Sequence, residues 1–193
     1  MSTSIKKSFA VVRPVAERLV AALGPYCRRV EIAGSLRRQR DMVGDIEIVA
    51  IPRRPTDLFS QEMDGPTLLD RFLDEQGVPF GKRGQKFQQF RYGRYSVDLF
   101  LPTVDTWGSV FTIRTGSAEF TKWLVTSRAA GGACPDEVNF HGGRLYAHGR
   151  LLATPEESDV FNAVGLAYVP PAERGGPLFD APRIEPIWIY ANE

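Results

Sequence analysis

Residues 34–47 of the chain read Gly-Ser-Leu-Arg-Arg-Gln-Arg-Asp-Met-Val-Gly-Asp-Ile-Glu, and this stretch decides the fold. Gly34 and Ser35 are expected to end one strand and open a short helix, and a second strand is expected to open at Asp45. Side chains two apart on a strand point to the same face. Asp45 and Glu47 are therefore predicted to share a face, while the isoleucine between them points into a core.

The same stretch combines an anion-binding turn with a pair of carboxylates. Two carboxylates a few ångströms apart repel each other and require a cation between them, and hard oxygen ligands select Mg²⁺ or Mn²⁺. A Gly-Ser turn at a helix N-terminus offers backbone N–H groups to a phosphate. Either motif alone is usually a plain turn or a solvated strand face, but their conjunction within fourteen residues is much rarer. The stretch therefore predicts a site for a metal-bound nucleoside triphosphate.

The order Gly-Ser, then Gly-Asp-x-Glu on the next strand, resembles the signature of the nucleotidyltransferase superfamily headed by DNA polymerase beta. Arg37 and Arg38, which follow Gly-Ser, narrow the resemblance to the family X DNA polymerases. It covers most of the chain, from about residue 11 to residue 175. It implies an α/β (α+β) fold: a nucleotidyltransferase palm with a mixed sheet in residues 1–102, followed by a small α+β C-terminal nucleotide-side subdomain in residues 103–193.

A third carboxylate is expected from a later strand. Residues 94–102 alternate between polar and apolar side chains, which is typical of a half-buried strand, and Asp98 lies among them. In isolation Asp98 would as readily be a charge on an edge strand. The superfamily that this chain resembles uses a third acidic residue there, so the resemblance implies that Asp45, Glu47 and Asp98 are catalytic and bind two ions of Mg²⁺ or Mn²⁺. Asp98 would then join the ion that activates the attacking hydroxyl.

Residues 114–120, Arg-Thr-Gly-Ser-Ala-Glu-Phe, resemble the Thr-Gly-Ser segment of family X, whose backbone lies against the sugar of the incoming nucleotide. The runs at 159–162 and 168–174 also resemble the C-terminal part of these polymerases, with Asp-x-Phe followed by Tyr-x-x-Pro-x-x-Arg. The nucleotide-binding residues that the resemblance implies are Gly34, Ser35, Arg38, Gly44, Arg114, Thr115, Gly116 and Ser117.

The chain also departs from the family X pattern. Glu47 replaces the usual aspartate, as in antibiotic-modifying nucleotidyltransferases of the same superfamily, and Thr121 replaces the asparagine that reads the base. Ile113 and Arg114 replace the aromatic pair that checks the 2′ position of the sugar, which predicts weak or altered discrimination between ribose and deoxyribose. Only residues 1–13 precede the first predicted helix of the palm, so we expect a minimal core that lacks the N-terminal lyase and helix-hairpin-helix regions, which grip DNA.

The composition is that of an ordinary globular protein. The 193 residues are 43% hydrophobic and 24% charged, which suffices for one or two small domains with a buried core. No apolar run reaches the ~18–20 residues that a membrane-spanning helix requires, and no signal-peptide pattern begins the chain. The cysteines, Cys27 and Cys134, lack the spacing of metal ligands, which favours a reducing compartment. We expect a cytoplasmic protein, a monomer, with no membrane partner.

Positive charge is concentrated in the first half of the chain. Residues 1–100 carry 17 Lys and Arg against 12 Asp and Glu, whereas residues 101–193 carry 7 against 11. The densest basic run, 82–94, mixes positive side chains with aromatics and contains no acid, which suits a nucleic-acid backbone with occasional base stacking. The alternative is a solvated hairpin whose Phe87 and Phe90 face the core. The nucleic-acid-binding candidates are Lys82, Arg83, Lys86, Arg91 and Arg94.

Residue patterns also place the secondary structure. Pro14 and Gly24 bracket a predicted helix, because proline suits the first turn and glycine the position after the last turn. Thr154 and Glu157 form a predicted capping box that opens another helix. Residues 107–113 fit a helix or a strand equally well. The remaining expected elements are helices at 66–77 and 117–130, strands at 30–33 and 45–51, a hairpin over 86–102 and short strands within 139–153.

The sequence leaves three functions open. The first is a family X-like enzyme, template-directed or terminal-transferase-like, that adds nucleoside monophosphates from (d)NTPs to the 3′-hydroxyl of a DNA primer and releases pyrophosphate by a two-metal mechanism. Its binding to DNA would be weak and salt-sensitive. The second is a nucleotidyltransferase that modifies a small molecule, a protein or an RNA end. The third is a nucleotide-binding module without catalysis, against which three intact carboxylates weigh.

Overall fold

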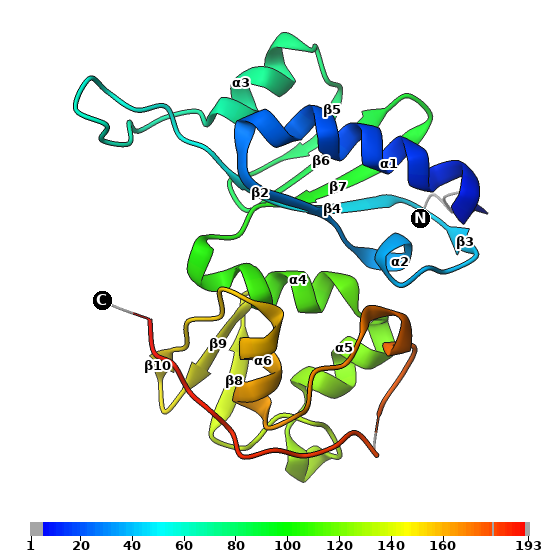
Figure 1. Cartoon of the computed structure of the whole chain (residues 1–193), viewed down its shortest axis with the longest axis vertical. Helices are drawn as coiled ribbons and strands as arrows, with labels where there is room; N and C mark the ends of the chain where they lie inside the picture. Colours follow the sequence, from blue (N-terminus) through cyan, green and yellow to red (C-terminus); the bar gives the residue numbers. More distant parts are fainter. Residues whose placement is uncertain (1–5, 179, 192–193) are drawn as a thin grey trace. The chain divides into compact units, whose positions relative to one another are not determined.

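The structure, a computed structural model, describes residues 6–178 and 180–191 (Figure 1). It has an α+β fold, as predicted, with a five-stranded mixed sheet, a three-stranded antiparallel sheet and helices. Within the described residues, no helix combines the length and the apolar character that crossing a membrane requires.

The chain divides into two compact units. The first consists of Met1–Leu36 with Asp41–Leu101, and the second of Arg37–Arg40 with Pro102–Glu193. The division lies one residue before the predicted boundary at 102, and it places a short piece of the opening stretch in the second unit. The two units are therefore not consecutive pieces of the chain.

The first unit is built on the five-stranded sheet. Its strands are β2 (Cys27–Ile32), β4 (Ile46–Pro52), β5 (Phe80–Arg83), β6 (Phe87–Tyr92) and β7 (Tyr95–Phe100). Their order across the sheet is β2-β4-β7-β6-β5, with β4 and β7 parallel and the other neighbours antiparallel. The predicted hairpin within residues 86–102 is formed by β6 and β7, which turn at Gly93 and Arg94 with Tyr92 opposite Tyr95. The two strands that carry Glu47 and Asp98 are thus neighbours inside the sheet.

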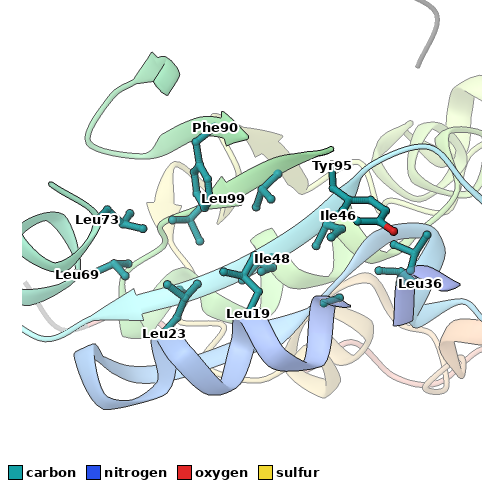
Figure 2. Packing of buried hydrophobic residues seen from close by; sticks show 14 of the residues in the cluster. Leu19, Leu23, Leu36, Ile46, Ile48, Leu69, Leu73, Phe90, Tyr95 and Leu99 are labelled. Atoms are coloured by element: carbon teal, nitrogen blue, oxygen red, sulfur yellow. The ribbon is translucent and has the colours of Figure 1, made fainter. Parts of the chain in front are cut away.

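Two helices, α1 (Phe9–Leu23) and α3 (Leu68–Glu75), pack on one face of this sheet (Figures 1 and 2). Leu19 and Leu23 of α1 are buried in one cluster with Ile48 of β4. Burial of each such side chain contributes about 1.5–3 kcal/mol. Because side chains alternate along a strand, the residues next to Ile48 point to the opposite face, and that face is the one that can carry polar chemistry.

Short elements connect the edge of the sheet to its interior within residues 34–47. α2 (Gly34–Arg37) is the predicted short helix, and it follows β2. β1 (Lys7–Ser8) pairs with β3 (Met42–Val43), which lies between α2 and β4 in the chain. The chain thereby passes from the edge strand β2 to the interior strand β4, and the predicted order of strand, short helix and strand is present.

α1 starts earlier than predicted. It begins at Phe9 rather than Pro14, because the buried Val12 continues the apolar stripe of the helix toward its N-terminus. Pro14 therefore lies inside the helix, where it has no N–H to donate to the carbonyl four residues earlier. The glycine that follows α1 opens the 3₁₀ helix η1 (Gly24–Tyr26) with right-handed backbone angles, without the left-handed conformation that usually favours glycine there.

The second unit combines the three-stranded sheet with helices. Its elements include α4 (Trp107–Thr115), α5 (Ala118–Val125), β8 (Val138–His141), β9 (Arg144–Ala147), β10 (Arg150–Leu151) and α6 (Glu157–Val164). Residues 107–113, which the sequence leaves undecided, are helical. α5 ends at Val125, short of the predicted residue 130, because the 3₁₀ helix η3 (Arg128–Ala130) and the left-handed Gly131 redirect the chain.

The start of α6 differs from the prediction. Its N-cap is Glu156, which forms a capping box with Asp159, rather than Thr154 with Glu157. Thr154 is instead buried, and its backbone N–H donates to the carbonyl of Asp105 at 2.8 Å. Its hydroxyl donates to the same carbonyl at 3.2 Å, so it is not available to cap the helix.

A buried ion-pair network joins separate segments of the second unit. Arg174 is fully buried, and its Nη1 donates to Oε1 of Glu157 at 2.7 Å. Nη2 of Arg37 donates to the other oxygen, Oε2, at 2.6 Å. Burial by itself would raise the pKa of Glu157, but the hydrogen bonds and charges of the two arginines outweigh it and hold this pKa below its ordinary value. The network ties the segment Arg37–Arg40 to α6.

Replacing Glu157 by glutamine is predicted to destabilise the fold by about 3–5 kcal/mol, because the buried Arg174 would lose its compensating charge. A carboxyl group whose pKa is lowered in the folded state stabilises that state above its unfolded pKa, and the contribution is lost as the pH falls through the folded value. Denaturant unfolding should therefore show wild-type stability falling below the ordinary glutamate pKa of 4.5. Glu157→Gln should flatten this dependence.

Glu173, an exposed residue that directly precedes Arg174 in the sequence, supplies the control for this prediction. Glu173→Gln should leave the unfolding free energy and its pH dependence close to those of the wild type. An unfolding free energy of Glu157→Gln equal to that of the wild type at pH 7 would show that the network contributes nothing to stability.

Candidate functional site

A row of polar side chains crosses the interior of the five-stranded sheet. Glu47 on β4 lies directly opposite Asp98 on the parallel strand β7, and Gln89 on β6 lies opposite Asp98 on its other side. Neighbouring strands are about 4.8 Å apart, and directly opposed residues point to the same face. The three side chains therefore stand in line on the face opposite α1 and α3.

Asp45 lies immediately before β4 and two residues before Glu47. It is half-buried, and this burial, followed by the negative charge of Asp98, raises the pKa of Asp45, while a hydrogen bond with its own backbone opposes the rise. The influence of Asp98 means that the two carboxylates are close enough to repel each other. The structure thus brings Glu47 beside Asp98, and Asp45 into electrostatic range of Asp98.

Gly34 packs directly against the carboxylate of Glu47. A Cβ atom on Gly34 would lie 1.8 Å from Oε2 of Glu47 and 3.1 Å from its Cβ. Gly34 also has a φ of 63°, in the left-handed region that side chains disfavour. Both constraints oppose any side chain at position 34. The absence of a side chain on Gly34 therefore leaves room for the carboxylate of Glu47, in addition to the phosphate-binding role predicted for this glycine.

The carboxylates around Asp98 have the donor chemistry of a site for a hard divalent cation. Asp45, Glu47 and Asp98 supply carboxylate oxygens, which Mg²⁺ and Mn²⁺ prefer, and a cation would relieve the repulsion between Asp45 and Asp98. In the described part of the chain, no group of three or more His, Cys, Asp or Glu side chains is already arranged to hold a metal ion. Convergence of all three carboxylates on two ions therefore stays a prediction.

In the second unit, two arginines hold the Thr-Gly-Ser turn. Nη1 of Arg38 donates to the carbonyl of Thr115 and, at 2.8 Å, to the carbonyl of Gly116. Nη1 of Arg37 donates to Oγ1 of Thr115 at 2.8 Å. The arginines differ in their other contacts, because Arg37 also belongs to the buried ion-pair network, whereas Arg38 bonds the backbone of the turn.

The other nucleotide-binding candidates are distributed over both units. Ser117 is the N-cap of α5, and its Oγ accepts a hydrogen bond of 3.0 Å from the backbone N–H three residues later. Arg114 is exposed near the end of α4. Gly34, Ser35 and Gly44 belong to the first unit. A contact with nucleotide stays a separate prediction for each of these residues.

The predicted nucleic-acid-binding run covers β5, β6 and the turn after β6. Arg83 is paired there, because its Nη1 and Nη2 donate to the carboxylate of Asp74 at 2.6 and 2.8 Å. Phe90 is buried in the core, and Phe87 lies against Phe100 with ring centroids 5.1 Å apart. Stacking of a base on Phe90 is therefore excluded, since strand alternation turns this ring inward. The exposed basic side chains of the run are those of Lys82, Arg83, Lys86, Arg91 and Arg94.

Sequence patterns do not single out Gln89, although the turn at Gly93 suffices to find it. In a two-residue hairpin with Tyr92 opposite Tyr95, counting three residues away from the turn on both strands places Gln89 opposite Asp98. Its Nε2 donates a hydrogen bond of 2.7 Å to Oδ1 of Asp98. The residue that contacts the third carboxylate thus comes from the partner strand of the hairpin.

Gly34→Ala and Gly93→Ala form a matched pair of variants. Both glycines have left-handed backbone angles, so alanine costs about 1–2 kcal/mol of stability at either position. Only at Gly34 would the new methyl group also collide with Glu47, because nothing lies within 4 Å of the Cβ position at Gly93. Gly34→Ala should therefore weaken Mn²⁺ binding in a calorimetric titration, and Gly93→Ala should retain it. Equal Mn²⁺ affinities in the two variants would mean that the packing of Gly34 against Glu47 does not affect binding of the ion.

Asp45→Asn is predicted to stabilise the metal-free protein at neutral pH. A carboxyl group whose pKa is raised in the folded state contributes stability below its unfolded pKa, and this contribution disappears as the pH rises through the folded value. The gain from Asp45→Asn should therefore be present at pH 7 and vanish below the ordinary aspartate pKa of 3.8. Thermal unfolding in the presence of a chelator measures it, with the exposed Asp41→Asn as control.

Added Mn²⁺ completes this test. It should raise the unfolding midpoint of the wild type, because a ligand that binds the folded state stabilises it, and it should raise that of Asp45→Asn much less. A midpoint for Asp45→Asn below that of the metal-free wild type at pH 7 would contradict the prediction.

A scan of the chain against models of known protein families finds no match. The resemblance to nucleotidyltransferases therefore rests on the motifs in residues 34–47, 94–120, 159–162 and 168–174. No family is assigned, and the chemistry of the carboxylate site carries the functional argument.

Proposed function

We propose that the protein is a nucleotidyltransferase, which transfers a nucleoside monophosphate from a (d)NTP to a hydroxyl group and releases pyrophosphate. The observation that carries the proposal is the position of the carboxylates within the sheet. Glu47 is directly opposite Asp98 on parallel strands, and Asp45 is near enough to Asp98 for their charges to interact. A module that only bound nucleotide would have no evident need for all three.

Each carboxylate has a part in the proposed reaction. The acceptor hydroxyl oxygen attacks the α-phosphorus, the bond from that phosphorus to the oxygen bridging to the β-phosphate breaks, and pyrophosphate leaves with the bonding electrons. Asp98 takes or directs the proton of the attacking hydroxyl, and Asp45 and Glu47 supply the negative charge that binds cations. Bound Mg²⁺ or Mn²⁺ would neutralise charge on the attacking and leaving oxygens. Phosphoryl transfer depends mainly on position and charge, so few further groups are required.

Triphosphate contacts are proposed for the Gly-Ser turn and for arginine side chains. Ser35 lies in the first turn of α2, where backbone N–H groups have no partner within the helix. Arg38 is better suited than Arg37, because Arg38 donates to neutral carbonyls of the turn, whereas the guanidinium of Arg37 pairs with the carboxylate of Glu157. The full set consists of Gly34, Ser35, Arg38, Gly44, Arg114, Thr115, Gly116 and Ser117.

Two classes of acceptor are consistent with the surface of the first unit. The exposed basic side chains of β5, β6 and the following turn favour a DNA primer that is bound weakly through its phosphates. The ion pair of Arg83 with Asp74 and the burial of Phe90 favour the other class, a small molecule, a protein or an RNA end. The ion pair neutralises one positive charge of the basic run 82–94, and the burial removes one aromatic ring on which a base could stack.

The proposal is tested by incubating the purified protein with labelled dNTPs or NTPs, Mg²⁺ or Mn²⁺, and one acceptor at a time. The acceptors are primed DNA, single-stranded DNA, an RNA end, a protein and a hydroxyl-bearing antibiotic. The wild type is expected to label at least one of them and to release pyrophosphate. Asp98→Asn should lower the rate by roughly 10²–10⁴-fold, because the base for the attacking hydroxyl is removed. Asp136→Asn, at an exposed aspartate of the second unit, is the control and should match the wild type.

The outcomes separate the hypotheses. Transfer that persists in Asp98→Asn would contradict the assigned chemistry. Nucleotide binding by the wild type without transfer to any acceptor would favour the non-catalytic module. The labelled acceptor distinguishes the two classes, and transfer to DNA should fall steeply with salt, because phosphate contacts are weakened by added counterions.

A further inference from the structure

The side chain of Gln89 holds one oxygen of Asp98. Nε2 of Gln89 donates a hydrogen bond of 2.7 Å to Oδ1 of Asp98, and the two residues are directly opposed on β6 and β7. Both side chains are half-buried. A hydrogen bond to an ionised carboxylate is roughly twice as strong as one between neutral groups, so this contact restrains the carboxylate firmly.

The bond fixes the direction in which the carboxylate of Asp98 faces. Because Oδ1 is held by Gln89 on β6, Oδ2 is the oxygen of Asp98 that this bond does not use, and Glu47 stands opposite Asp98 on the other neighbouring strand, β4. The donor is an uncharged amide, so this bond places no positive charge beside the carboxylate. A lysine or arginine at position 89 would also hold the carboxylate, but it would cancel the negative charge of Asp98.

β6 carries a second bond of the same kind on its other face. Nε2 of Gln88 donates to Oδ1 of Asp70 at 2.7 Å, and Gln88 is buried. The other oxygen of Asp70 accepts from the backbone N–H and the hydroxyl of Thr67 at the start of α3. The Gln88–Asp70 bond therefore joins a helix to the sheet on the side away from Asp98, and it offers an internal comparison.

We propose that Gln89 is a positioning residue of the carboxylate site. It orients Asp98 so that Oδ2 faces the space toward Glu47, in which a divalent cation is bound. The inference rests on the proposed function, because the ion belongs to that function. Partners that orient a metal ligand typically contribute about 10–100-fold to metal affinity or activity. Gln89 contacts neither ion nor nucleotide and acts through Asp98.

The experiment compares Gln89→Met with Gln88→Met. Methionine has nearly the length and volume of glutamine but no N–H donor, so each variant deletes one amide–carboxylate bond from adjacent positions of one strand. Mn²⁺ alone is the probe, and the EPR signal of free Mn²⁺ reports how much is bound. Gln89→Met should weaken binding by about tenfold or more, and Gln88→Met should keep the affinity within about twofold. Gln88→Met should instead lower the midpoint of thermal unfolding.

A second readout does not depend on the metal. The side-chain amide protons of Gln89 should shift in the NMR spectrum of Asp98→Asn, because their acceptor changes, and those of Gln88 should not. Asp70→Asn should give the converse pattern. If the chemical shifts of the Gln89 side-chain amide are unchanged in Asp98→Asn, the hydrogen bond is absent and the inference is overturned.

The Mn²⁺ titration separates failure of this inference from failure of the proposed function. If Asp98→Asn loses binding but Gln89→Met binds as the wild type does, only the inference is overturned. Tighter binding by Gln89→Met overturns it too, because Gln89 would then compete with the ion for Oδ1. A wild-type protein that binds no Mn²⁺, or that binds it equally after Asp98→Asn, overturns both.

Discussion

The parallel pairing of β4 with β7 is the constraint on which the candidate site depends. It sets Glu47 directly beside Asp98, although these residues are far apart in the sequence. Ionised carboxylates at this spacing repel each other, and the opposite face of the same strands offsets that repulsion by burying an apolar cluster under α1 and α3. The apolar core and the candidate site thus occupy the two faces of one sheet. A local arrangement that lowers stability is typical of a functional site.

The buried carboxylate of the second unit, that of Glu157, is paired with positive charges, unlike the neighbouring carboxylates of the candidate site. Glu157 accepts from two arginines, and its pKa is lowered, so its charge is fully compensated by its surroundings. Asp45 is half-buried within electrostatic range of another carboxylate, and burial and that charge raise its pKa. The two pKa shifts thus have opposite directions, because arginine partners lower that of Glu157, whereas burial and a neighbouring carboxylate raise that of Asp45.

Features of the structure that are set by local sequence patterns could be predicted more fully than features that are set by contacts between distant segments. The helix and strands within residues 34–47 and the hairpin of β6 and β7 follow from glycines and strand alternation, which act over a few residues. The first residue of α1 and the N-cap of α6 depend on the burial of Val12 and Thr154, which tertiary packing decides. For the site, alternation identified the candidate carboxylates. The pairing of Arg83 with Asp74 and the buried ion-pair network have no period in the sequence, so no pattern indicates them.

The segment Arg37–Arg40 belongs to the second unit, although in the sequence it lies between the two segments of the first unit. A ribosome makes this segment long before its hydrogen-bond partners, Thr115 and Glu157. While the chain grows, Arg37 therefore lacks these partners, and it acquires the second of them only when residue 157 has emerged. Contacts across such a long separation are formed late and slowly. A fragment that begins after residue 101 would therefore lack part of the second unit, whereas residues 1–101 contain every segment of the first.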